Sequence, residues 1–343
     1  MDQFTIEKPK LSAATWLGLT LISDTDVLRS KSVMGGSVVK GPPGVVEMEN
    51  LLFVPGWRCL FTKDGRRVEE TVSFGSYPGI RPITAAKLAK HDPPETPVRA
   101  EQVIDEVVTF GGPTIPHYGH QLTDGMARQW WRDDNPSLIT APLSGYQLAL
   151  AEMGSPRRII SPDRPTLFRR VVVPLPSILT DGVIHDVHDM EHRRVAETAL
   201  VRSDFHPGPR IYVSRSRLRS ARCVDGEQEL EALLSRAGYQ IIHPQDLPLA
   251  DQIAAFNRAR VIVGCSGSAM HTSLFHLGGP LNIVTLSGPR FNRRFSLVDR
   301  IKSYKATYVQ CLGFTERDAR GAISSMNLDM ARAIEGLDIA GAL

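Results

Sequence analysis

Four arginines lie within eight positions, directly after a short apolar segment, residues 211–213. A guanidinium group can donate two parallel hydrogen bonds to phosphate oxygens, so this cluster predicts a binding site for a diphosphate. A solvated basic loop is the alternative. The residues of this cluster that we expect to contact the ligand are Ser214, Arg215, Arg219 and Arg222.

A turn rich in small residues, 263–271, forms a second candidate binding site. Small side chains between a strand and a helix let a ligand approach the backbone N–H groups, and a serine can cap the helix. The turn lacks the third glycine and the later acidic residue of a dinucleotide fingerprint. Its histidine either contacts a ribose or phosphate or packs in the core. The candidate contacts are Gly264, Ser266, Gly267, Ser268 and His271.

An imidazole and a carboxylate stand four residues apart at His120 and Asp124, in a segment expected to be helical from about 118 to 131. Side chains at this spacing share one face of a helix. The carboxylate can orient the imidazole, or either group can act as a general base; a simple contact on the helix surface is the alternative. Aromatic residues nearby offer either a surface on which sugar rings stack or core packing. They are His117, Tyr118, Trp130 and Trp131.

The elements that would position these groups are most regular after residue 205. Short apolar segments alternate there with helical segments of about ten residues. This alternation predicts βαβ units in a parallel sheet, whose ligands bind at the carboxyl ends of strands. We expect a capping box from Asp225 and Gln228 at the start of helix 227–237. The other expected elements are strands 211–213, 239–242, 260–263 and 281–286 and helices 250–259 and 268–277.

The first half is richer in turn residues and less regular. Expected strands are 103–110, 145–151, 158–160 and 171–173, and a helix is expected over 186–202, before a hinge rich in proline and glycine. The expected domains are an N-terminal domain with an irregular, β-rich start (1–204), a Rossmann-like domain (205–315) and a C-terminal helix (316–343).

Composition excludes several classes of protein. A chain of 343 residues suggests about two domains, and a net charge of +3 gives no polyelectrolyte character for binding nucleic acid. Four widely spaced cysteines suit a reducing compartment. No signal peptide or long apolar run is evident, so we expect a cytoplasmic protein, with peripheral contact at the inner face of a membrane left open.

The motifs together resemble glycosyltransferase family 61, whose bacterial members are commonly described as capsular polysaccharide biosynthesis proteins. The resemblance runs from about residue 118 to 286, roughly half the chain. It consists of segment 118–124, residues 211–215 with Arg222, segment 249–264, and segment 267–275.

The resemblance implies an α/β fold with two Rossmann-like domains in a GT-B-like arrangement. It implies an inverting hexosyl- or pentosyltransferase that moves a sugar from a nucleotide-sugar to an oligosaccharide or lipid-linked glycan in capsular or exopolysaccharide synthesis. No metal or other cofactor is expected. Ser214, Arg215, Arg222 and the turn 266–271 would hold the nucleotide, and His120 or Asp124 would be the base.

Rival interpretations are a non-catalytic scaffold that binds nucleotide-sugars and a GT-B-like pyruvyltransferase that uses phosphoenolpyruvate. The sequence Asp24-Thr25-Asp26 could indicate a metal-dependent transferase. His188 and His192 are one helical turn apart and could be zinc ligands, although a charged, solvated helix is the stronger interpretation.

Overall fold

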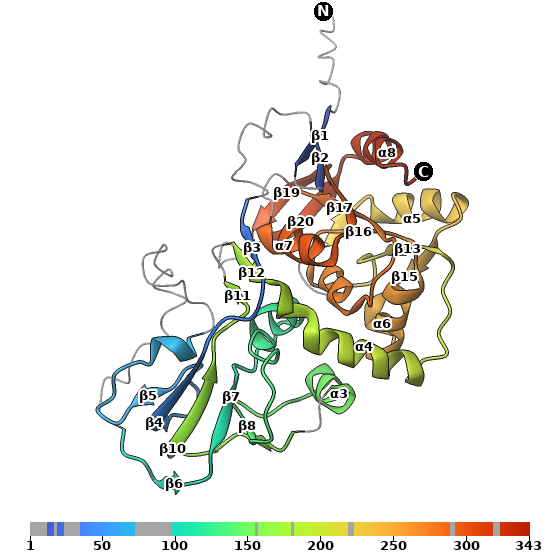
Figure 1. The fold of residues 1–343 in the computed structure, drawn as a ribbon. Coiled ribbons are helices and arrows are strands. Elements are labelled where there is room, and N and C mark those ends of the chain that lie inside the picture. The colour runs from blue at the N-terminus through green and yellow to red at the C-terminus, as the bar shows by residue number, and fades with distance from the viewer. Residues whose placement is uncertain are drawn as a thin grey trace, which may run out of the picture.

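The computed structural model describes residues 12–16, 19–23, 35–72, 98–154, 157–179, 182–218, 223–288, 292–317 and 323–343. The fold is mixed α/β, as expected. Two large sheets lie at opposite ends of the molecule, and helices α4 (Met190–Arg202) and α6 (Leu249–Arg258) lie between them (Figure 1).

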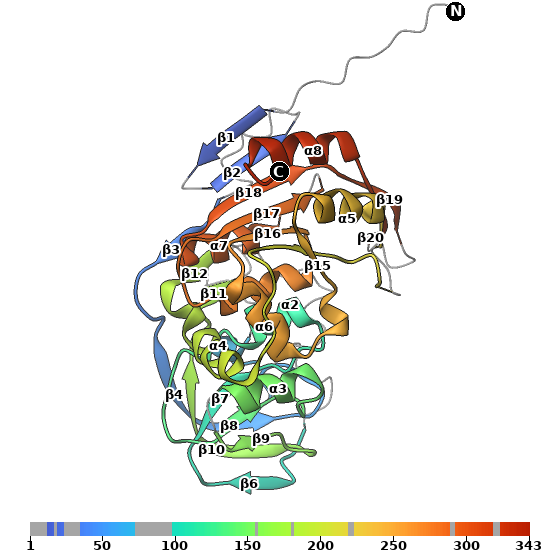
Figure 2. The ribbon, with the colours of Figure 1, turned by 90° about the vertical axis from the view of Figure 1, so that its right-hand side faces the viewer.

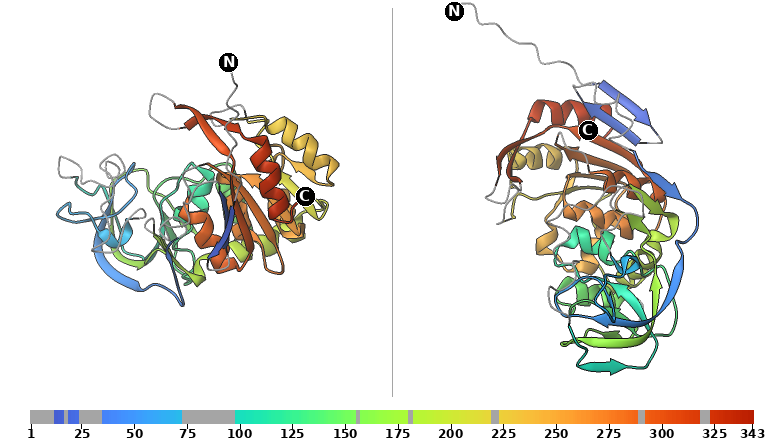
Figure 3. Two further views of the ribbon diagram at one scale, coloured as in Figure 1. Left: turned by 90° about the horizontal axis from the view of Figure 1, so that it is seen from above. Right: turned by 90° about the vertical axis from the view of Figure 1, so that its left-hand side faces the viewer.

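The sheet of the second half has seven strands in the order β1-β2-β18-β17-β16-β13-β15. All neighbouring strands are parallel except the β1–β2 hairpin. The N-terminal hairpin, expected within the first domain, therefore lies in the sheet of the second, where Figure 3 shows it in blue beside the orange and red strands. The strands are β1 (Ser12–Trp16), β2 (Leu19–Ser23), β13 (Arg210–Val213), β15 (Gln240–Ile242), β16 (Val261–Cys265), β17 (Asn282–Ser287) and β18 (Lys305–Gln310).

Helices cover both faces of this sheet because its strands are apolar on both sides. Tyr212 faces one helical layer, whereas its neighbours Ile211 and Val213 face the other. Figure 2 shows α5 (Glu227–Arg236) and α8 (Met330–Ile339) above the sheet and α6 below it. The lower layer also contains the 3₁₀ helix η6 (Ser268–Phe275) and α7 (Arg293–Lys302).

The sheet of the first half follows the order β5-β4-β10-β7-β8-β9, with β6 paired to β10. Strands β10, β7, β8 and β9 are parallel, and β4 and β5 are antiparallel additions. The strands are β4 (Val45–Phe53), β5 (Phe61–Thr62), β6 (Gln102–Ile104), β7 (Val108–Gly112), β8 (Ser137–Ile139), β9 (Ile159–Ile160) and β10 (Thr166–Pro174).

Short elements complete the fold. Two three-stranded sheets have the orders β11-β12-β3 and β14-β20-β19. Their strands are β3 (Ser37–Val39), β11 (Ile178–Leu179), β12 (Val183–His185), β14 (Cys223–Asp225), β19 (Leu312–Arg317) and β20 (Ile323–Leu328). The remaining helices are η2 (Glu69–Thr71), α2 (Tyr118–His120), the π-helical turn η3 (Gln121–Gly125), α3 (Tyr146–Met153), η4 (Asp186–Asp189) and η5 (Pro244–Asp246).

The two halves share an apolar core rather than meeting across an open gap. Helices α4 and α6 pack against each other in this core. Side chains from both halves contribute to it, including Leu122, Met126, Val195, Ile253, Phe275 and Leu297. This interface fixes the position of α2 and η3 relative to η6 and α7.

Several expected elements differ from those observed. The expected strand 145–151 is helix α3, in keeping with its leucines, alanines and glutamine, which are strong helix formers. Asp225 ends strand β14, and Gly226, with φ +85°, is the N-cap of α5, so the predicted capping box does not form. Residues 316–343, expected as a helix, contain strand β20 before α8 begins.

The histidines of α4 and the turn before it are structural. His188 and His192 are 2% and 0% exposed, so the expectation of a solvated helix was wrong for these residues. The imidazole Nε2 of His192 lies 2.9 Å from the carbonyl oxygen of Leu122, and burial lowers the pKa of His192 to about 4. Across the residues that the structure describes, no group of three or more potential ligands could hold a metal ion. Asp24 and Asp26 lie outside those residues.

A buried carboxyl group in α7 predicts a pH-dependent stability. Asp299 accepts a hydrogen bond from the hydroxyl of Tyr308, and burial raises the pKa of Asp299 to about 7. The folded chain therefore binds more protons than the unfolded chain between about pH 4 and pH 7, and stability falls as the pH rises through this window.

Asp299→Asn tests this interpretation, because the asparagine side chain cannot ionise and keeps an acceptor for Tyr308. We expect this variant to melt several degrees above the wild type at pH 8, in circular dichroism, and the difference to narrow at pH 5. A difference that does not change with pH would contradict this interpretation.

Candidate functional site

A pocket of about 460 Å³ lies near the predicted contacts, at the carboxyl ends of β13 and β16. After β13 the chain continues to β15, which pairs with one edge of β13. It then crosses to β16, which pairs with the other edge of β13. Helices are thus directed to opposite faces at this point, which opens a crevice where doubly wound sheets bind ligands. The position of the pocket therefore follows from the strand order.

The pocket brings together residues from both halves of the chain. Four of the predicted ligand contacts line it: Ser214, Arg215, Gly267 and Ser268. The first half contributes three aromatic residues: His117, Tyr118 and Tyr146. Gly264, Ser266 and His271 are not among its lining residues, and Arg219 and Arg222 lie outside the described residues.

Arg215 is held firmly at the wall of this pocket. Its backbone N–H donates to Glu227 Oε1 at 2.9 Å, and its Nη1 donates to the carbonyl oxygen of Ser266 at 3.0 Å. A Cβ atom on Gly267 would lie 2.9 Å from the same Nη1, so the close approach of the guanidinium requires glycine there. The result is a fixed positive charge beside the turn that follows β16.

The other predicted contacts have different surroundings. The hydroxyl of Ser214 donates to the carboxylate of Glu231, and Ser266 contributes its carbonyl oxygen rather than its side chain to the contact with Arg215. A Cβ atom on Gly264 would lie 2.6 Å from the sulfur of Met270, so this glycine lets η6 pack on the sheet.

His120 and Asp124 do form the expected pair, and an arginine from the second half joins them. Asp124 Oδ2 lies 2.9 Å from His120 Nδ1. Arg294, in the first turn of α7, places Nη2 2.8 Å from Asp124 Oδ1 and Nη1 2.7 Å from His120 Nδ1. The sequence analysis missed Arg294. The sequence signal that could have identified Arg294 is a pair of arginines at the start of the helix that follows β17. This helix begins beyond the carboxyl end of β17, another strand of the same sheet.

The position of one proton decides what this cluster can do. The guanidinium of Arg294 only donates, so His120 Nδ1 accepts from it when the imidazole proton is on Nε2. When the proton is on Nδ1, the imidazole donates to Asp124 Oδ2, and Nε2 becomes the basic atom. This second state has the tautomer that a general base requires.

Exposure distinguishes the two candidate bases. The side chain of Asp124 is 1% exposed and that of His120 is 39% exposed. Both Asp124 oxygens are engaged, Oδ1 by Arg294 and Oδ2 by His120 and by the hydroxyl of Thr123 at 3.2 Å. An acceptor hydroxyl could therefore reach the imidazole but not the carboxylate.

Helix α2 lies directly against η6. His117 Nδ1 accepts the N–H of His120 at 3.4 Å, so its proton is on Nε2, which donates to the hydroxyl of Ser268 at 3.2 Å. A Cβ atom on Gly119 would lie 2.8 Å from the imidazole of His271, so glycine permits the contact between the halves. The His117–Ser268 contact thus joins the wall of the pocket to the turn that carries His120.

His271 is a packed histidine rather than a lining residue of the pocket. Its ring stacks on Phe295 with centroids 4.3 Å apart. Burial, with a smaller effect from the charge of Arg294, lowers the pKa of His271 to about 3. The ring is therefore neutral at physiological pH and forms an apolar support beside the cluster.

Comparison with known proteins identifies the segment that carries these features. Residues 118–280 match the family model of glycosyltransferase 61. The resemblance expected from the sequence is thereby confirmed over this span, just under half of the chain. The glycosyltransferase 61 segment contains the His120–Asp124 pair, Arg215 and the turn after β16; Arg294 lies outside it. The family match supports transferase activity with a sugar donor and an acceptor.

No curated protein matches the sequence significantly. Among the described residues, no helix is both long and apolar enough to cross a membrane.

Proposed function

We propose that this protein is an inverting, metal-independent glycosyltransferase that uses a nucleotide-sugar as donor and a saccharide as acceptor. The observation that carries the proposal is the juxtaposition of the pocket beside Arg215 with the His120–Asp124–Arg294 cluster, through the contact of His117 with Ser268. The volume of the pocket, about 460 Å³, suits a nucleoside diphosphate.

In the proposed reaction, the acceptor oxygen attacks the anomeric carbon as His120 Nε2 takes the hydroxyl proton. The new bond between carbon and acceptor oxygen forms as the bond between the anomeric carbon and the phosphate oxygen breaks. The bonding electrons leave with the nucleoside diphosphate, whose negative charge Arg215 stabilises. Asp124 stabilises the imidazolium, and attack opposite the leaving group inverts the anomeric centre.

We further propose that the second half binds the donor and the first half binds the acceptor, in a GT-B-like arrangement of two Rossmann-like domains. The second sheet is assigned to the donor because the carboxyl ends of its strands β13 and β16 form the pocket, at the point where the strand order reverses. The proposed role is in capsular or other surface polysaccharide synthesis, in the cytoplasm or at the inner face of the membrane.

Nucleotide binding tests this proposal directly. We expect one of UDP, GDP, CMP or dTDP, or its sugar conjugate, to raise the melting temperature by a few degrees, since a ligand that binds only the folded state stabilises it. Arg215→Ala should remove this shift because it removes the fixed positive charge of the pocket. Arg217→Ala is the matched control, since Arg217 lies in the same loop, is exposed and pairs with Asp246 at 3.0 Å.

The outcomes separate the rival functions. Equal nucleotide shifts in the two variants would remove Arg215 from the donor site. A shift with phosphoenolpyruvate alone would favour pyruvyl transfer. Nucleotide binding without transfer to any saccharide acceptor would favour a scaffold.

A further inference from the structure

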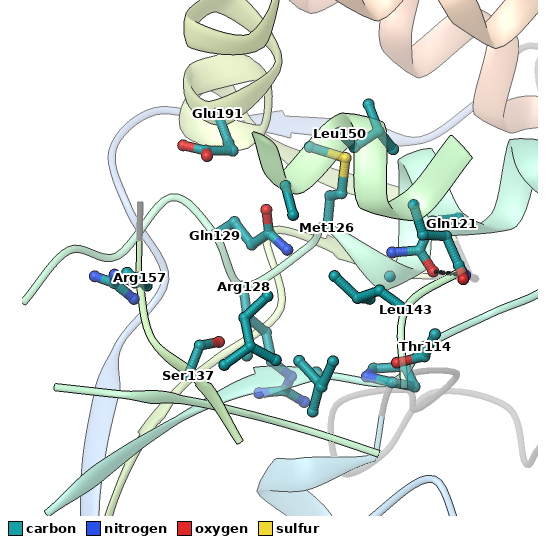
Figure 4. A pocket seen from close by; sticks show the side chains of 18 of the residues that line it. Thr114, Gln121, Met126, Arg128, Gln129, Ser137, Leu143, Leu150, Arg157 and Glu191 are labelled. Carbon is teal, nitrogen blue, oxygen red and sulfur yellow. Dashed lines mark hydrogen bonds between the residues drawn. The ribbon is translucent and has the colours of Figure 1, made fainter. Parts of the chain in front are cut away.

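A separate cavity of about 120 Å³ lies in the first half, at the carboxyl ends of β7 and β8 (Figure 4). The chain runs from β7 to β8 and β9 on one side and returns to β10 on the other side. The carboxyl end of β7 is therefore at a reversal of strand order, the position at which parallel sheets bind ligands. The first sheet thus has a crevice equivalent to the donor crevice of the second.

Most of the charged residues that line this cavity are arginines. It includes three arginines, Arg128, Arg132 and Arg157, and a single carboxylate, Glu191. Glu191 is already paired with Arg132 at 2.5 Å and with Arg194 at 3.2 Å. Arg157 pairs with Asp133 at 3.5 Å, so Arg128 is the lining arginine for which the described residues supply no carboxylate.

Arg128 is the central group because it is buried and the described residues offer it no counter-ion. Its side chain is fully enclosed, and its two terminal nitrogens donate to the carbonyl oxygens of Val72 and Pro174. Among the described residues, its Nε has no hydrogen-bond partner and no carboxylate forms an ion pair with it. Burial lowers the pKa of Arg128 only to about 9, so the group remains charged at neutral pH. A buried, unpaired cation is costly, and an anionic ligand would offset that cost.

A glycine lies beside Arg128 and leaves space there. A Cβ atom on Gly112, whose φ is +104°, would lie 3.5 Å from Arg128 Cδ and 4.0 Å from Arg128 Nε. Gln129 lies at the centre of the view in Figure 4, and within the described part of the chain its side-chain amide makes no hydrogen bond. The cavity thus offers a cation, an amide donor and room for a small oxyanion.

We propose that this cavity binds an oxyanion of the acceptor, so that the acceptor is an acidic saccharide bearing a carboxylate or a phosphate. The proposal rests on the proposed function. The segment 117–125 connects the two sites, because Gln121 and Gly125 line the cavity whereas His117 and Tyr118 line the donor pocket. An acceptor held in this cavity would therefore contact the turn that directly follows His120.

Binding of simple anions tests the proposal without the transfer reaction. The probes are D-glucuronate, inorganic phosphate and, as the neutral analogue, D-glucose. Binding is followed by calorimetry and by tryptophan fluorescence, because Trp131 lines the cavity. We expect saturable binding of glucuronate or phosphate and none of glucose; the anion that binds identifies the acidic group.

Gln129→Glu is the informative variant because it adds a negative charge to the cavity without removing a described hydrogen bond of the side chain. We expect it to weaken anion binding by about tenfold or more. Gln102→Glu makes the same change at an exposed position on β6, outside the cavity lining, and should have no effect. Arg128→Gln should also abolish anion binding if it folds.

The results distinguish this inference from the proposed function. The inference would be overturned if neither anion binds the wild type, or if Gln129→Glu binds the anion as well as the wild type does. Nucleotide binding would in that case still support the proposed function. A different result would be that the protein binds an anion, that Gln129→Glu weakens this binding, and that no nucleotide binds. This result would support the anion site and count against the proposed function.

Discussion

His120→Ala is expected to lower the turnover number of sugar transfer by about 10²–10⁴-fold, the usual contribution of a general base. The imidazole is the exposed member of the cluster, whereas both oxygens of Asp124 are engaged. The variant keeps every residue of the second half that lines the donor pocket, so the thermal shift caused by the nucleotide should be unchanged. The loss should therefore appear in turnover and not in donor binding.

The control for this variant is His206→Ala. His206 is another partly exposed imidazole, which lies in the hinge between the halves, and its Nδ1 is 2.7 Å from the carbonyl oxygen of Asp204. Its replacement should leave the transfer rate unchanged. A His120→Ala enzyme with the full rate at saturating donor and acceptor would exclude His120 as the base.

Three central strands of the second half could be predicted closely from the sequence. The expected strands 211–213, 260–263 and 281–286 differ from β13, β16 and β17 by two residues or fewer at each end. These strands are buried on both faces, so each is a short apolar segment bounded by turn residues. The sequence pattern and the tertiary environment agree there.

The region around His120 could not be predicted in the same way. The expected helix 118–131 is interrupted by the π-helical turn η3, and packing explains the difference. The side-chain carbonyl of Gln121 accepts the N–H of Ile115 at 2.7 Å, and a Cβ atom on Gly125 would lie 2.6 Å from the side chain of Gln121. Contacts between η3 and the end of β7 decide this geometry, and helical periodicity does not report them.

Only part of the candidate site was predicted, because some of its contacts also depend on tertiary packing. The pair His120–Asp124 is local, so its spacing was sufficient to suggest the contact. Arg294 is 170 positions from Asp124, and only the packing of α7 against η3 and η6 brings them together. Gly264 and Ser266 were predicted as ligand contacts from their small size. The small size of Gly264 instead serves close packing of η6, and Ser266 contacts Arg215 through its backbone carbonyl oxygen.

Arg294→Met is expected to lower the free energy of unfolding by about 3–5 kcal/mol, the usual cost of removing one partner of a buried ion pair. Asp124 is 1% exposed and Arg294 is 10% exposed, so solvent cannot replace the lost partner of the carboxylate. The pair also joins the first half of the chain to the second. Urea unfolding of the whole chain measures the change. Arg293→Met, on the exposed neighbouring residue, is the matched control and should be close to neutral.

The double variant Asp124→Asn/Arg294→Met separates charge from packing. If the loss in Arg294→Met comes from an uncompensated carboxylate, the double variant should be more stable than that single variant, because no charge remains buried alone. The double variant should also have much lower transferase activity than the wild type, since the imidazole of His120 then has no carboxylate to orient it. A double variant no more stable than Arg294→Met would show that the arginine stabilises the interface through its packing, and that the ion pair with Asp124 contributes little.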